Sequence, residues 1–154
     1  MPNLDQADAR LLAALQQDCK LSTQELAERA ALSPSPAWRR VRRLENEGVI
    51  AGYVALVNPR AVGLNTSAYI HVSLTDHSPE NIRAFDAFVA REVQIVECAS
   101  ITGADDYLLK VVARDPEDLE AFLMHRLLAL GFVRSSTTHF VLRQKKNATA
   151  LPVL

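Results

Sequence analysis

Residues 22–48, STQELAERAALSPSPAWRRVRRLENEG, decide how the first third of the chain folds. Ser22 followed by Glu25 fits a capping box, in which each side chain satisfies a free backbone N–H at the start of a helix. The stretch Ala31–Ser33 interrupts that helix, and Gly48 is a natural stop for the helix that follows. A short helix, a tight turn and a second helix are the order of a helix-turn-helix motif.

The second helix of this motif begins at a serine. Either Ser33 or Ser35 is its N-cap, because Pro34 and Pro36 then lie in the first turn, where the missing N–H of proline is not needed. A further helix precedes the motif, with Asp5 predicted as its N-cap. The sequence therefore predicts three helices before residue 48, followed by a β-rich run over 49–57.

Four arginines fall within residues 39–43, RRVRR, on the second helix of the motif. This helix normally lies in the major groove and reads bases near its N-terminus. Arginine forms two parallel hydrogen bonds with guanine or with phosphate. Helical spacing turns Ala37, Val41 and Leu44 inward and leaves the polar side chains outward. We therefore predict a surface that binds double-stranded DNA, made of Ser22, Thr23, Ser33, Ser35, Trp38, Arg39, Arg42 and Arg43.

Two features of this surface have a second interpretation. The charged run is alternatively a solvated helix face, in which Glu45 and Glu47 pair with Arg42 and Arg43 along the helix. Trp38 fits a partly buried filler of the core as well as it fits a surface contact.

The overall composition bounds the class of protein. Hydrophobic residues make up 49% and charged residues 23% of the 154 positions, which excludes a disordered or collagen-like chain. The formal net charge is −1, so any nucleic acid must be bound by a local patch. No apolar run reaches the roughly 18 residues of a membrane span, and MPNLDQADAR lacks the pattern of a signal peptide. We expect a cytoplasmic protein without a membrane partner, with Cys19 and Cys98 reduced.

The last two-thirds of the chain contain an internal repeat at a shift of 37 residues. Ala84-Phe85 aligns with Ala121-Phe122, and each copy has a helix opened by a capping residue and proline, Ser78-Pro79 or Asp115-Pro116. Alternating apolar residues before and after each helix predict strands. The order strand, helix, strand, strand, helix, strand is that of the ferredoxin-like fold.

The predicted fold class is therefore α+β, a three-helix winged helix-turn-helix followed by a ferredoxin-like βαββαβ domain. We predict a DNA-binding domain with the following β segment at 1–57, a hinge at 58–66, an effector-binding and oligomerisation domain at 67–143, and a tail at 144–154. One face of the sheet carries the helices. The other face is half apolar, so a second copy of the chain is expected to cover it as a homodimer. The residues of that face are Tyr69, His71, Leu108, Lys110 and Val112.

The sequence resembles the Lrp/AsnC, or feast/famine, family of transcription regulators over nearly its whole length. The segments that carry the resemblance are LDQADARLLAALQQD, ELAERAALSPSPAWRRVRRLENEGVIAGYVALVNP, TGADDYLLKV and THFVLRQKKNATALP. The resemblance implies a dimer built on the ferredoxin-like domain and assembly of dimers into rings, often octamers. It also implies a free amino acid as effector, bound between dimers near the loop before Tyr107. Family members often have glycine where Ala31 stands. Here an alanine must either adopt a left-handed conformation, at about 1 kcal/mol, or follow a local 3₁₀ path.

The loop before Tyr107 also suits an amino acid on chemical grounds. Asp106 can accept hydrogen bonds from an ammonium group, and backbone N–H groups around Gly103 can meet a carboxylate. No basic residue lies within the loop, which favours an apolar over an acidic effector. A hairpin turn with solvated aspartates is the alternative. The predicted effector-binding residues are Thr102, Gly103, Ala104, Asp105, Asp106, Tyr107, Thr137 and Thr138.

No catalytic, cofactor or metal motif stands out. The four histidines are scattered, no phosphate-binding or dinucleotide-binding glycine pattern is present, and Cys98 has apolar neighbours. We predict a regulator rather than an enzyme, with no metal and no cofactor. The alternative function is a metabolite-binding or enzyme-regulatory oligomeric module without DNA binding, which the arginine cluster argues against.

Overall fold

The computed structural model describes residues 3–153 and divides into two compact units. The first comprises Met1–Leu56 with Lys145–Leu154, and the second comprises Val57–Gln144. The predicted segments 1–57 and 144–154 each include terminal residues that lie outside the described part of the chain, namely Met1, Pro2 and Leu154. No helix within residues 3–153 is long and apolar enough to cross a membrane.

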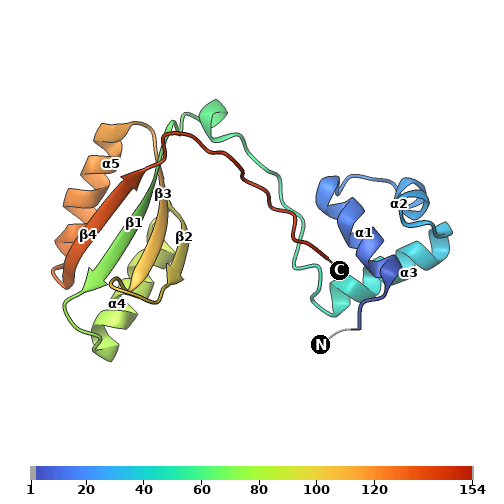
Figure 1. Ribbon diagram of the computed structural model, residues 1–154, viewed down its shortest axis with the longest axis horizontal. Helices are drawn as coiled ribbons and strands as arrows, with labels where there is room; N and C mark the ends of the chain where they lie inside the picture. Colours follow the sequence, from blue (N-terminus) through green and yellow to red (C-terminus); the bar gives the residue numbers. More distant parts are fainter. Residues whose placement is uncertain (1–2, 154) are drawn as a thin grey trace. The chain divides into compact units, whose positions relative to one another are not determined.

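Three helices make up most of the first unit (Figure 1): α1 Gln6–Gln17, α2 Thr23–Ala30 and α3 Pro34–Asn46. Asp5 and Ser22 cap α1 and α2 as predicted, and each takes part in a complete capping box. Ser33 rather than Ser35 is the N-cap of α3, with Pro34 as the first helical residue. The helix-turn-helix order expected from the sequence is confirmed.

Short apolar side chains from all three helices form the core of this unit. Ala37 and Leu44 of α3 are buried as predicted, whereas Val41 is half-buried and packs against the edge of the core. The small alanines let the three helices approach closely. The clustered core residues are Leu11, Ala14, Leu26, Ala27, Ala30 and Ala37.

The turn between α2 and α3 uses a left-handed alanine. Ala31 has φ 54° and ψ 50°, and its N–H bonds back into the last turn of α2. Of the two conformations expected for this turn, the left-handed one is therefore present and the 3₁₀ path is absent.

The β structure predicted for residues 49–57 does not form. Val49 and Ile50 close onto the end of α3 through bonds to the Leu44 carbonyl, and residues 51–57 then run on without any strand pairing. The β-branched and aromatic composition of this run favours a strand, but a strand needs a partner backbone, and no segment within residues 3–153 pairs with it.

The C-terminal residues belong to the first unit. The side-chain amide nitrogen of Gln16 on α1 donates to the Leu151 carbonyl at 3.0 Å, and the Leu151 N–H donates back to the Gln16 side-chain oxygen Oε1 at 2.6 Å. These two hydrogen bonds, both made by the Gln16 side chain, connect the C-terminal tail to α1.

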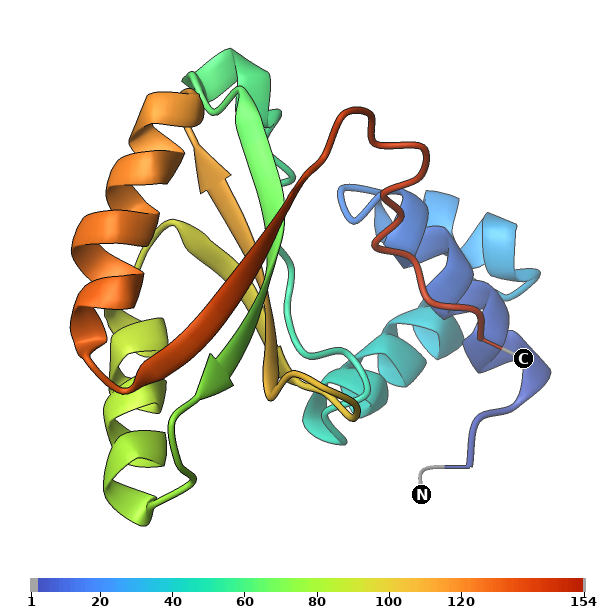
Figure 2. The same ribbon diagram turned by 60° about the vertical axis from the view of Figure 1, so that its left-hand side comes forward.

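The second unit is a four-stranded antiparallel sheet in the order β2-β3-β1-β4, with two helices on one face (Figure 2). The predicted ferredoxin-like topology is confirmed. A short 3₁₀ helix, Pro59–Val62, precedes the first strand, and α5 continues through a π turn, Leu123–Leu127, and a 3₁₀ turn, Leu128–Leu130. The elements are β1 Thr66–Leu74, α4 Pro79–Arg91, β2 Ile95–Ser100, β3 Tyr107–Ala113, α5 Pro116–Phe122 and β4 Val133–Phe140.

The repeat seen in the sequence is the repeat of this sheet-and-helix unit. Ser78 caps α4 and Asp115 caps α5, each with proline at the next position, as predicted. The aligned Phe85 and Phe122 are both buried between sheet and helices. Strand alternation sends Ile70 and Leu109 to this core, and it sends the residues predicted for the outer face away from it.

We predict that Ala31→Gly raises the free energy of unfolding by about 1 kcal/mol, because glycine adopts the left-handed conformation without the steric cost of a Cβ. Urea unfolding followed by circular dichroism measures the change. Ala30→Gly is the matched control: this neighbour is buried at the end of α2, and the change should lower stability by about 1 kcal/mol. A loss of stability in both variants would contradict the prediction.

Candidate nucleic-acid interface and effector loop

The outward face of α3 carries most of the residues predicted to bind DNA. Ser33 makes no side-chain capping bond, Ser35 is exposed, and Trp38 is 53% exposed, so the surface interpretation of Trp38 is the one observed. Arg39 is also exposed, and among residues 3–153 no ion pair involves it. These side chains together present hydroxyl, indole and guanidinium donors over two turns of one helix.

Arg42 is held in place by its neighbours on the same helix. Its guanidinium lies 5.7 Å from the centroid of the Trp38 ring, and it donates to Glu45 at 3.1 Å. Glu45 also accepts a hydrogen bond from the Tyr53 hydroxyl at 3.0 Å. Burial and this bond raise the pKa of Tyr53 to about 12, so the hydroxyl remains a donor at neutral pH. The side chain of Arg42 is still 61% exposed and can reach a ligand.

The other two arginines of the cluster contact α1 instead. Arg40 lies 2.7 Å from Asp5 and 2.9 Å from Asp8, and Arg43 lies 2.6 Å from Asp8. Arg43 was predicted to bind DNA, but its guanidinium is engaged within the protein and also lies 4.0 Å from Glu47. Sequence reasoning missed Asp8 as a partner, because nothing local marks a contact that spans 32 to 35 residues.

Ser22 and Thr23 lie at the start of α2. The Ser22 hydroxyl accepts the Glu25 N–H and donates to the Glu25 carboxylate at 2.7 Å, so its hydrogen-bonding capacity is largely used by the capping box. Thr23 is exposed as the first residue of the helix.

The predicted effector loop connects β2 to β3. Gly103 has φ +125°, a conformation that strains any residue with a Cβ. The loop is closed by the Ile101 N–H, which donates to the Asp106 carbonyl, and it is joined to β1 by the Asp106 N–H, which donates to the Val72 carbonyl. Thr102, Gly103 and Ala104 are exposed at its tip.

Both aspartates of the loop have partners in the protein. Asp106 accepts the Leu74 N–H at 2.7 Å and contacts the His77 ring Nε2 at 2.8 Å. The Leu74 N–H holds the pKa of Asp106 below its usual range, burial opposes this, and His77 lowers the pKa further. The alternative of a hairpin turn with solvated aspartates therefore does not describe Asp106, whose carboxylate has partners within the protein.

Asp105 faces the outer side of the sheet. It accepts a hydrogen bond from the buried Ser73 hydroxyl at 2.9 Å. His71 Nδ1 lies 3.3 Å from its other oxygen, without the alignment of a hydrogen bond. Sequence reasoning missed both histidine partners, because they come from β1 and from the segment after it.

Thr137 and Thr138 do not share a face. Thr137 pairs with His71 and therefore lies on the outer face, whereas Thr138 pairs with Ile70 and lies on the helix-covered face. β1 separates both from β3. Within one chain, the two hydroxyls therefore do not point to the same side of the sheet.

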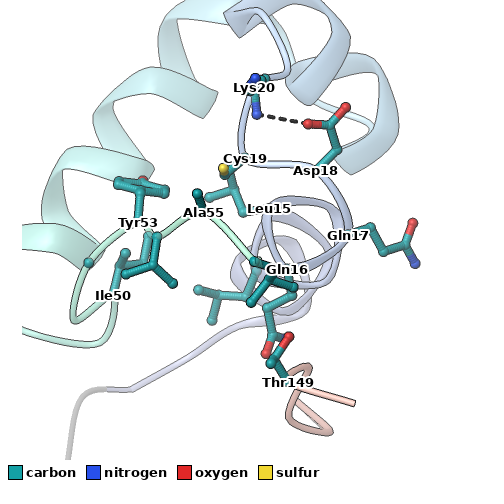
Figure 3. Close-up of a pocket in the computed structure, with 14 residues that line it drawn as sticks. Leu15, Gln16, Gln17, Asp18, Cys19, Lys20, Ile50, Tyr53, Ala55 and Thr149 are labelled. Carbon is teal, nitrogen blue, oxygen red and sulfur yellow. Dashed lines mark hydrogen bonds between the residues drawn. The ribbon is translucent and has the colours of Figure 1, made fainter. Parts of the chain in front are cut away.

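The first unit also contains a pocket of about 500 Å³ that the sequence did not indicate. Figure 3 shows Ile50, Tyr53 and Ala55 on one side of it and Leu15 and Gln16 of α1 on the other. Thr149 of the tail completes the lining. The residues predicted to bind DNA and effector lie elsewhere.

Comparison with known proteins assigns each part of the chain. Residues 4–51 match a model described as winged helix-turn-helix DNA-binding, and residues 67–151 match the Lrp/AsnC ligand binding domain. The chain is 35% identical over 150 residues to the DNA-binding transcriptional activator DecR of Escherichia coli, covering 97% of this chain and 99% of that one. It is 35% identical to the leucine-responsive regulatory protein of Salmonella typhimurium, covering 98% and 92%.

A solved structure has the same fold over nearly the full length. The transcriptional regulator of Neisseria meningitidis in complex with L-Met is 36% identical, with a TM-score of 0.94 and 97% of both chains covered. These matches define a protein with a winged helix-turn-helix and a ligand-binding domain. The chain belongs to the Lrp/AsnC family of transcription regulators. Membership of this family decides against the alternative function, a metabolite-binding or enzyme-regulatory oligomeric module without DNA binding.

The depressed pKa of Asp106 predicts a pH dependence. Its ionised form is stabilised in the folded state, so the contribution is complete above the usual value of 3.8 and is lost as the pH falls through the lower folded pKa. We predict that Asp106→Asn lowers the free energy of unfolding at neutral pH and reduces its decline between about pH 5 and pH 2. Urea unfolding across this range measures both. Glu120→Gln, at an exposed position of α5, should leave the decline unchanged.

Proposed function

We propose that this regulator binds double-stranded DNA through the exposed face of α3 and responds to a small apolar amino acid bound at the Gly103–Tyr107 loop. The observation that carries the proposal is the pairing of two features in one chain. One feature is a helix-turn-helix whose second helix exposes Arg39 and Arg42. The other is a ligand-binding domain whose β2–β3 loop carries the Asp106 carboxylate, fixed in position by the Leu74 N–H.

The DNA surface consists of the predicted residues of α3 and its N-cap that form no ion pair with α1, together with Thr23 at the start of α2. Arg42 is the strongest candidate for reading a base, because the Trp38 ring and Glu45 restrict its side chain in the free protein. A restricted side chain loses less conformational entropy when it binds. The proposed DNA-binding residues are Thr23, Ser33, Ser35, Trp38, Arg39 and Arg42.

The effector proposal centres on Asp106. A carboxylate has about four acceptor positions, so the Leu74 and His77 contacts leave capacity for an ammonium group. Backbone N–H groups at the exposed tip, residues 102–104, meet the effector carboxylate. The relatives support an apolar effector, since one is named leucine-responsive and another was solved with L-Met.

We also propose that the protein is cytoplasmic and forms at least a homodimer through the second unit, with assembly of dimers into an octamer. The outer face of its sheet is half apolar. In addition, Val96 and Phe140 on the two edge strands and Leu142 just after β4 are each more than half exposed in the single chain. A second copy that covers these side chains removes apolar surface from water.

Arg42→Ala tests the DNA contact. We expect binding to a mapped operator to weaken by roughly 1–3 kcal/mol, with relaxed preference at one base position, because a bidentate contact to one base is lost. Fluorescence anisotropy with single-base operator variants measures both. Arg83→Ala is the control, because it removes the same charge from α4 in the second unit. This variant should bind the operator as the parent does. Unchanged operator binding by Arg42→Ala would remove this residue from the interface.

Asp106→Ala tests the effector site. We expect calorimetric titration with L-Leu and L-Met to lose its binding heat, because the acceptor for the ammonium group is gone. DNA binding and sedimentation should stay as in the parent, since Asp106 lies outside the unit that contains Arg42. Binding as tight as the parent's would refute the assignment. Joint loss of DNA binding and assembly would show that the aspartate is structural.

A further inference from the structure

The four arginines of α3 are not equivalent, and the difference is set by α1. Asp8 is fully buried, and its two carboxylate oxygens are taken by different guanidinium groups: Arg40 at 2.9 Å and Arg43 at 2.6 Å. Arg40 also contacts Asp5 at 2.7 Å. Arg39 and Arg42 have no contact with α1 among the hydrogen bonds and ion pairs of residues 3–153.

Ion pairing with α1 separates the charges of this helix. Positions three and four apart are both neighbours on a helix surface, so spacing alone places Arg43 beside Arg39 as well as beside Arg40. The contacts with Asp8 divide the cluster: Arg40 and Arg43 form one row, and Arg39 and Arg42 form the other. The first row faces the start of α1, and the second row is on the exposed side with Trp38.

The buried carboxylate holds the first row strongly. Burial by itself would raise the pKa of Asp8, but the Asp5 N–H and then the two guanidinium groups lower it below its usual range. Asp8 is therefore ionised at neutral pH. An ionised group that is out of water requires its partners, since removing them leaves an uncompensated buried charge.

We propose that Asp8 is a positioning residue for DNA recognition: it keeps Arg40 and Arg43 off the phosphate backbone and so limits binding to DNA of any sequence. This inference rests on the proposed DNA contact of α3. Four adjacent arginines free to reach phosphates would bind every duplex tightly, since phosphate contacts carry no sequence information. Because Asp8 holds two of the arginines, the contacts of Arg39 and Arg42 contribute a larger share of the total binding free energy on DNA.

Salt dependence counts the arginines that contact phosphate. Each phosphate neutralised contributes about 0.9 to the slope of log affinity against log salt concentration on B-form DNA. An arginine paired inside the protein contributes nothing to this slope, whereas an arginine released from its partner adds to it. A purely structural role for Asp8 predicts weaker binding on its removal, with no steeper slope.

Asp8→Asn is the primary test. Asparagine keeps an oxygen for the Asp5 N–H at the start of α1 and removes the charge that holds the arginines. The probe is a mixed-sequence duplex, titrated by fluorescence anisotropy over a series of KCl concentrations. We expect tighter binding at low salt and a slope steeper by about 0.9 for each arginine released. Glu28→Gln removes the same charge from α2, where the carboxylate contacts only Gln24 among the described side chains, and corrects for net charge. A folded Asp8→Asn protein with an unchanged or shallower slope would overturn the inference.

Single arginine variants test the same inference without touching Asp8. Arg40→Gln and Arg43→Gln each leave one guanidinium on the carboxylate, and we expect both to keep the parent slope. On the mixed-sequence duplex, which offers Arg42 no cognate base, Arg39 and Arg42 both contact phosphate, so Arg39→Gln and Arg42→Gln should each lower the slope by up to about 0.9. Equal losses of slope in all four variants would overturn the proposed role of Asp8 while supporting the DNA surface. If none of the four changes the slope, the proposed DNA surface is wrong, and the role of Asp8 is wrong with it.

Discussion

The carboxylate of Asp8 on α1 forms ion pairs with two arginines of α3. It is buried, it completes the capping box of α1, and it accepts both Arg40 and Arg43 from the second helix of the helix-turn-helix. Because a buried ion needs all of its partners, the angle and register of α3 against α1 are restricted to those that deliver both guanidinium groups. The exposed row of Trp38, Arg39 and Arg42 then follows from that register.

A comparable arrangement organises the second unit. Asp106 is the last residue of the loop between β2 and β3, and its carboxylate contacts the Leu74 N–H and the His77 ring. A single side chain therefore links the loop, the end of β1 and the segment before α4. The exposed tip of the loop is thereby anchored at its base. An effector at the tip would thus meet a preformed carboxylate, which reduces the conformational cost of binding.

Much of the fold could be predicted because it depends on local chemistry. The capping residues Asp5, Ser22, Ser78 and Asp115 begin helices wherever they are followed by the right pattern, and each does so here. Alternation over β1 and β3 assigned the two faces of the sheet correctly, since successive side chains of a strand point to opposite faces. The left-handed conformation of Ala31 was one of the two expected for that turn from the sequence, the other being a local 3₁₀ path.

The sequence by itself determined the three helices, the repeated strand-helix-strand units, the family and the stretch of α3 that carries the positive charge. Tertiary structure decided which of those charges are available, because the pairs of Asp8 with Arg40 and Arg43 connect residues more than thirty positions apart. It also left residues 51–57 without a strand partner and placed Thr137 and Thr138 on opposite faces. Periodicity and capping act over a few residues, whereas ion pairing and strand pairing depend on where the folded chain brings distant groups together.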